Sequence, residues 1–134
     1  MKLYGGIDLH SNNSYIVLID GRGAVMMRSR VCNEIGRVLQ TLAPYQERID
    51  SLAVESTYNW YWLIDGLKTA GYAVKLANPS AMQQYAGLKY SDDRNDARWL
   101  AEMLRLGILP TGYIYPEAHR PLRDLLGQRR LLVR

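Results

Sequence analysis

The order of short apolar runs along the chain constrains the fold more than any other feature. Leu3 to Leu9 and Ser14 to Ile19 are apolar and rich in β-branched residues, and the polar turn residues between them predict a hairpin. A third run, Ala24 to Val31, alternates enough to extend the hairpin into a three-stranded antiparallel meander. Helix-like and strand-like segments then alternate, which is typical of parallel strands joined by helical crossovers.

This order predicts an α/β domain of three layers, with a mixed five-stranded sheet flanked by helices. Ribonuclease-H-like folds have the same order of elements. The later elements are recognised by apolar residues at helical spacing, by turn residues and by N-cap chemistry. They are a helix between the N-cap Asn33 and Pro44, a strand at Ser51 to Val54, a helix ended by Gly71, a strand at Tyr72 to Ala77, and a helix at Asp93 to Leu106.

Composition adds limits to this fold class. The chain has 134 residues, 48% of them apolar, which is enough for one domain with a core that needs no metal or disulfide. Its one cysteine, Cys32, has no internal partner, and we expect it to be a small buried hydrophobe. No apolar run is long enough to cross a bilayer and no signal peptide is recognisable, so we expect a cytoplasmic protein.

The net charge of +4 is concentrated near the end of the chain. Residues 117–134 are rich in arginine and have the pattern of a basic amphipathic helix, whereas the rest is nearly neutral. We therefore expect a catalytic domain over 1–116 and, over 117–134, the start of a truncated continuation. Basic charge of this kind favours nucleic acid as a partner.

Four acidic residues occupy special places in this pattern. Asp8 lies inside an apolar strand, where a carboxylate is costly unless it is paired or bound to a metal. Glu55 follows the strand at Ser51 to Val54. Asp93 and Asp96 are three residues apart, which places both on one face of a helix. Each acid taken singly fits a solvated strand end or a helix N-terminus, but together they form a candidate site.

Convergence of four carboxylates would require compensation, because like charges a few ångströms apart repel each other strongly. Oxygen ligands select hard cations, Mg²⁺ or Mn²⁺. Two such ions would clamp the attacking and leaving oxygens of a phosphodiester. The acids therefore predict phosphoryl transfer on nucleic acid.

Three motifs carry a family resemblance. Gly6-Ile7-Asp8-Leu9-His10, Val54-Glu55-Ser56-Thr57 and the segment from Lys89 to Ala97 resemble those of DEDD transposases, the insertion sequence 110 family that includes Piv-type invertases. The similarity covers essentially the whole chain. It implies a RuvC-like, ribonuclease-H-like domain in which Asp8, Glu55, Asp93 and Asp96 bind magnesium and act in cutting and rejoining DNA.

The resemblance also implies partners. Members of the family use a structured bridge RNA to choose donor and target DNA, and they assemble as dimers and tetramers. We expect nucleic acid to contact basic residues beside the acids and in the tail. These are Lys89, Arg94, Arg120, Arg123, Arg129 and Arg130.

The chain departs from the family in its length. Family transposases continue into a C-terminal domain that supplies a catalytic serine, so we expect this chain to bind metal without completing recombination. Three alternatives stay open: a RuvC-type Holliday-junction resolvase, a non-catalytic module for RNA binding or dimerisation, and an actin-like ATPase or sugar kinase. The first phosphate loop of the last two resembles the segment from Gly5 to Ser14.

Other residues near the acids have two interpretations. The aromatic residues after Glu55, which are Tyr58, Trp60, Tyr61 and Trp62, could stack on unpaired bases. We expect Trp60 to pack in the core instead, and Tyr58 or Tyr61 to be exposed near the acidic site. His10 fits either a ligand or proton shuttle, or a turn residue.

Overall fold

The computed structural model describes residues 2–56, 60–77, 96–109 and 111. Five strands form one sheet in the order β3-β2-β1-β4-β5. The chain enters through β1 (Leu3–Leu9), β2 (Asn13–Ile19) and β3 (Val25–Cys32), which pair antiparallel as the predicted meander. β4 (Ile49–Ser56) then pairs parallel to β1, and β5 (Val74–Leu76) parallel to β4. The predicted mixed five-stranded sheet is confirmed.

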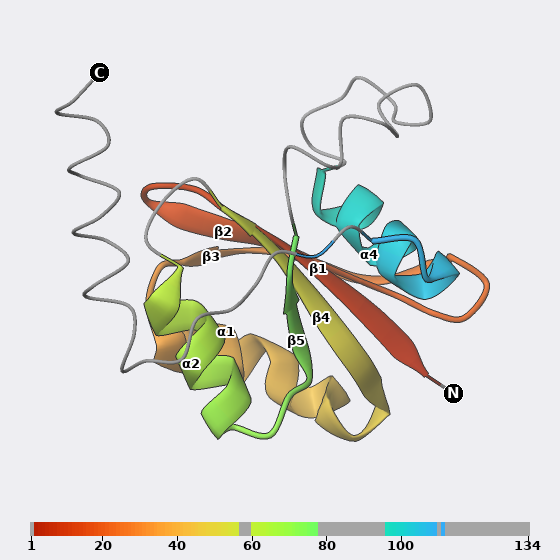
Figure 1. Ribbon diagram of the computed structural model, residues 1–134. Coiled ribbons are helices and arrows are strands. Elements are labelled where there is room, and N and C mark those ends of the chain that lie inside the picture. The colour runs from red at the N-terminus through yellow and green to blue at the C-terminus, as the bar shows by residue number, and fades with distance from the viewer. Residues whose placement is uncertain (1, 57–59, 78–95, 110, 112–134) are drawn as a thin grey trace, which may run out of the picture.

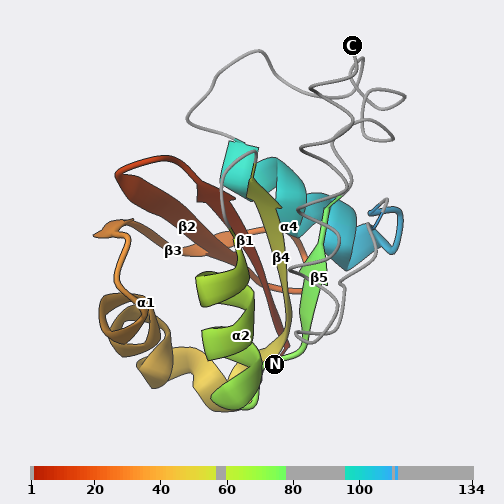
Figure 2. The ribbon, with the colours of Figure 1, turned by 60° about the vertical axis from the view of Figure 1, so that its left-hand side comes forward.

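Helices cover both faces of the sheet (Figures 1 and 2). On one face lie α1 (Ile35–Leu42), the short 3₁₀ helix η1 (Ala43–Arg48) and α2 (Tyr61–Thr69). On the other face α4 (Asp96–Leu106) crosses β1, β2 and β4. The three-layer architecture expected from the alternation is therefore present.

Each face of the sheet has its own core, because side chains alternate along the strands. Toward α1 and α2, residues such as Ile7, Leu52 and Ile64 form a large buried cluster. Toward α4 the side chains are smaller: Ala53 packs with Leu100 and Met103, and Val17 packs with Ala97 and Ala101. Small residues let α4 lie close to the sheet.

Several expected boundaries differ from those of the structure. Asn33 is not the N-cap of α1, since Glu34 holds that position and makes no side-chain cap hydrogen bond. The Asn33 side chain instead bonds to Ser14 and to the backbone of His10. β4 is longer than expected and β5 shorter, whereas the helix before Gly71 ends as predicted, with Gly71 at a positive φ of 100°.

Cys32 is exposed rather than buried, so that expectation was wrong. It is the last residue of the edge strand β3 and lines a pocket between β3 and α1. Within the described residues, no helix combines the length and the apolarity that a bilayer crossing would need.

Candidate functional site

Asp8 and Glu55 lie side by side near the carboxyl ends of the adjacent strands β1 and β4. They are register partners on the parallel strands β1 and β4, so their Cα atoms are about 5 Å apart, one strand spacing. Both stand two residues after positions that face α4: a side chain at Gly6 would meet Ala97, and Ala53 packs against Leu100. Because side chains alternate along a strand, both carboxylates leave the sheet on the α4 face.

Asp8 is 8% exposed, which is low for a carboxylate. Its Oδ2 lies 3.1 Å from Nε2 of His10, two residues further along the chain. Glu55 is partly buried. The sequence left His10 open between a ligand and a turn residue, and the structure places it in direct contact with Asp8.

The N-terminus of α4 lies at the same end of the sheet. The helix runs from Ala97, whose carbonyl faces Gly6, to Arg105, which donates a hydrogen bond to the carbonyl of Gly21 at the far end of β2. It is therefore antiparallel to β1 and begins, at Asp96, near the carboxyl ends of β1 and β4. The backbone of Asp96 is thus placed beside the two acidic strand ends.

The other predicted site residues lie outside the described part of the chain. They are Asp93 and the basic candidates Lys89, Arg94, Arg120, Arg123, Arg129 and Arg130, together with the aromatic Tyr58. Among the side chains that the structure describes, no three acidic, histidine or cysteine residues gather as a metal site. The described part therefore holds a pair of carboxylates, Asp8 and Glu55, with His10 beside Asp8.

The carboxylate pair fits a hard divalent cation by its chemistry. Its donors are oxygens on adjacent rigid strands, and Mg²⁺ in proteins is bound by one or two carboxylates while it keeps several waters. The negative charge of the partly buried Glu55 next to that of the buried Asp8 also favours a cation in this place. Asp8 and Glu55 are the described residues that would hold such an ion.

The aromatic residues after Glu55 belong mainly to the opposite layer. Trp60 and Trp62 pack against the core beneath α1 and α2, and the ring of Trp60 contacts that of Tyr61 edge to face at 4.4 Å between centroids. Core packing was the expected role for Trp60, although its side chain is only half-buried.

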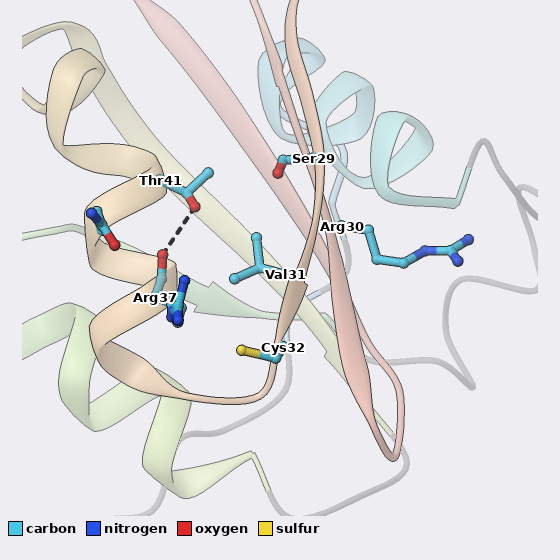
Figure 3. Close-up of a pocket in the computed structure, with 7 residues that line it drawn as sticks. Ser29, Arg30, Val31, Cys32, Arg37 and Thr41 are labelled. Carbon is cyan, nitrogen blue, oxygen red and sulfur yellow. Dashed lines mark hydrogen bonds between the residues drawn. The ribbon is translucent and has the colours of Figure 1, made fainter.

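A pocket between β3 and α1 is separate from the acidic pair. It has a volume of about 260 Å³ and is lined by Ser29, Arg30, Val31, Cys32, Arg37, Gln40 and Thr41 (Figure 3). Val31 belongs to the core on the α1 side, the face opposite to that of Asp8 and Glu55. The Thr41 hydroxyl donates to the carbonyl of Arg37 at 2.9 Å. This pocket therefore does not give access to the carboxylates.

Sequence reasoning did not select the arginines of β3. Arg28 and Arg30 are exposed and are register partners of Val17 and Tyr15. Their alternation with Met27, Ser29 and Val31 was visible in the sequence, but only the pairing with β2 places them on the same face as Asp8.

A five-stranded mixed sheet with an acidic residue near the carboxyl end of each of two adjacent inner strands, and with helices on both faces, defines a ribonuclease-H-like domain. Among solved structures, T. thermophilus RuvC in complex with a Holliday junction substrate matches with a TM-score of 0.60 at 16% identity, over 84% of this chain and 100% of that chain. The RuvC-like fold is therefore confirmed.

The family model of the DEDD transposases of insertion sequence 110, described as transposase, matches residues 5–134. The chain belongs to this family, as its motifs predicted. No curated protein matches the chain significantly.

Proposed function

We propose that this chain is the DEDD domain of a transposase that cleaves and transfers DNA strands with the help of Mg²⁺, or Mn²⁺ in its place. Membership in the transposase family supports the substrate and the reaction class. The observation that carries the proposal is the pairing of Asp8 with Glu55 on adjacent parallel strands, at the end of the sheet where α4 begins with Asp96.

Asp8, Glu55, Asp93 and Asp96 are the proposed cation ligands. Bound Mg²⁺ would supply activation of the attacking oxygen and charge stabilisation at the leaving oxygen of the phosphodiester. The sheet positions Asp8 and Glu55 rigidly, because each sits in a strand with hydrogen-bonded neighbours on both sides. Rigid placement of ligands on strands favours a defined coordination geometry.

Thermal unfolding against Mg²⁺ and Mn²⁺ tests the cation site. A ligand at a hundred times its dissociation constant adds about 2.7 kcal/mol to the free energy of unfolding. We expect metal to raise the unfolding midpoint of the wild type and of Asp50→Asn, but not that of Asp96→Asn. Asp50 is a suitable control because it is an exposed carboxylate at the opposite end of β4, paired with Lys2 at 3.7 Å. An equal response of all three proteins, or none, would contradict the proposed ligands.

The partners expected of such a transposase belong to the same proposal. Donor and target DNA would be chosen by a bridge RNA, and the protein would act as a homodimer or a higher homo-oligomer. The basic segment 117–134 is our candidate for contact with RNA or with a second protomer. Comparing the chain with a version that ends at residue 116, for RNA affinity and for mass in solution, tests both contacts.

A RuvC-type resolvase is the second candidate, since the fold of this chain covers all of the RuvC chain that it matches. Cleavage of a four-way junction by the chain alone, with no cleavage of a linear duplex, would favour that function over transposition.

A further inference from the structure

The sheet face that α4 covers has an uncovered margin at β3. α4 packs on β1, β2 and β4, whereas Arg28 and Arg30 of β3 are exposed. Arg28 is paired with Val17, which packs against Ala97 and Ala101 of α4, so both arginines lie on the α4 face. Figure 3 shows the Arg30 side chain leaving β3 on the side opposite to Val31, away from α1.

Arg30 stands in one cross-strand row with the acidic pair. Arg30 on β3 is the register partner of Tyr15 on β2, and Tyr15 is in turn the partner of Asp8 on β1. On its other side Asp8 is the register partner of Glu55 on β4. All four side chains leave the same face. Since neighbouring strands are about 4.8 Å apart, the Cα of Arg30 lies about 10 Å from that of Asp8, with Tyr15 between them.

A third arginine borders this margin from α4. Glu102 and Arg105, which form an ion pair, approach the β2–β3 turn at Gly23 and Gly21. Arg98 lies one helical turn before Glu102 on that same side of the helix, and it is exposed. Side chains of a helix lean toward its N-terminus, so Arg98 leans toward the end of the sheet where Asp8 and Glu55 lie.

These three guanidinium groups carry positive charge that no described carboxylate neutralises. Within residues 2–56, 60–77 and 96–109, no ion pair joins Arg28, Arg30 or Arg98 to an acid, whereas Arg105 pairs with Glu102 and Lys2 with Asp50. The arginines therefore form a basic margin, defined by Arg28, Arg30 and Arg98, on the same face of the sheet as the buried Asp8 and the partly buried Glu55. Its charge is complementary to a polyanion that approaches those acids.

We propose that the basic margin binds backbone phosphates of the DNA strand and holds that strand across the row that ends at Asp8 and Glu55. Arg28 and Arg30 are two residues apart on one strand, about 6.7 Å, a spacing suited to successive phosphates of a DNA strand. Tyr15 is half-buried and lies between Arg30 and Asp8, so a sugar or base of the bound strand would contact its side chain. Contacts of this kind position a strand without reading its sequence.

This inference rests on the proposed function for the identity of the polyanion. Its test is the salt dependence of DNA binding, because each arginine that neutralises a phosphate contributes about 0.9 to the slope of log K against log salt for duplex DNA. The probe is a labelled duplex of mixed sequence, with EDTA present so that binding does not depend on a cation at the acids.

We expect the double variant Arg28→Gln/Arg30→Gln to bind DNA more weakly than the wild type, with a slope smaller by about 2 units. Arg98→Gln alone should reduce the slope by about 1 unit. The matched control is Arg37→Gln/Lys68→Gln, which removes the same charge from exposed positions on α1 and α2, across the sheet. It should keep the wild-type slope. Since all five residues are exposed, each variant should unfold at nearly the wild-type midpoint.

Three results would overturn the inference: no measurable DNA binding by the wild type, an equal loss of slope in the two double variants, or a loss confined to a matched RNA probe. Asp8→Asn separates this inference from the proposed function, since it should lose the stabilisation by Mg²⁺ and, in EDTA, keep the wild-type slope. If neither Mg²⁺ nor Mn²⁺ raises the unfolding midpoint of the wild type but the slopes differ as expected, the basic margin stands and the proposed cation site fails.

Discussion

Gly6 of β1 lies directly beneath the backbone of Ala97 in the first turn of α4. A Cβ at Gly6 would collide with the carbonyl of Ala97 and would stand 2.9 Å from the nitrogen of Ala101. The helix can therefore reach the sheet only because this position lacks a side chain. The same contact places Ala97 of α4 over β1 two residues before Asp8.

Gly6→Ala should therefore destabilise the domain by roughly 1–3 kcal/mol, because helix and strand backbones would have to separate. Urea unfolding measures the loss. Gly36→Ala is the matched control: nothing lies within 4 Å of a Cβ there, and alanine is the better helix former in α1, so its stability should be unchanged or higher by up to about 1 kcal/mol. If both variants unfold like the wild type, α4 is not held against β1 as described.

Asn33 connects β3 to the turn that follows Asp8. Its side-chain amide donates to the carbonyl of His10 at 2.7 Å, and its oxygen accepts from the hydroxyl of the fully buried Ser14 at 2.8 Å. Asn33→Ala would leave the Ser14 hydroxyl without this acceptor and should cost about 1–3 kcal/mol.

Asn33→Asp keeps the acceptor for Ser14 and loses the donor to His10, so its loss should be smaller. Gln40→Ala, an exposed change in α1, should have little effect. Urea unfolding of the three variants ranks them, and a wild-type midpoint for Asn33→Ala would show that the two hydrogen bonds contribute nothing.

Much of this fold could be predicted from the spacing of apolar residues along the sequence. Apolar residues recur at every second position in a strand that is buried on one face, and at every third or fourth position in a helix that is buried on one face. Asp8 and Glu55 were found because a carboxylate in or after an apolar strand is conspicuous. Their adjacency depends on the register between β1 and β4, which no local pattern contains.

The errors arose from tertiary contacts. Asn33 has the chemistry of an N-cap, but a long-range partner, the carbonyl of His10, takes its side chain. Cys32 was expected in the core because cysteines usually are, but it falls on an edge strand. Arg28 and Arg30 were ordinary exposed residues until strand pairing placed Arg30 in the row of Asp8.

Asp20 closes the turn between β2 and β3. Its carboxylate accepts backbone hydrogen bonds from Ala24 at 3.0 Å and from Arg22 at 2.8 Å. These bonds hold the pKa of Asp20 below its usual value, with smaller help from the charges of Arg22 and Arg105.

A carboxyl whose pKa is lowered by folding stabilises the folded state above its unfolded pKa, and this stabilisation is lost as the pH falls through the folded pKa. Asp20→Asn keeps an oxygen acceptor but removes the charge. We expect the variant to be less stable than the wild type at neutral pH and the two to converge below about pH 4. Urea unfolding midpoints of both proteins, measured from neutral pH to below about pH 4, check this prediction. A difference in stability that persists at low pH would assign the effect to hydrogen-bond geometry rather than to charge.

Asp8→Asn removes one of the two adjacent carboxylates near the carboxyl ends of β1 and β4. Without metal, the remaining Glu55 no longer faces a second negative charge one strand away, so the free energy of unfolding should rise in EDTA. For a domain of this size each kcal/mol raises the midpoint by about 4 °C. The contact between Asp8 and His10 opposes this gain, since its loss removes a partner 3.1 Å away.

Asp50→Asn in the same buffer controls for the loss of a surface charge, and added Mg²⁺ should stabilise that control but not Asp8→Asn. A lower midpoint for Asp8→Asn in EDTA would mean that the pairing with His10 outweighs repulsion between the acids.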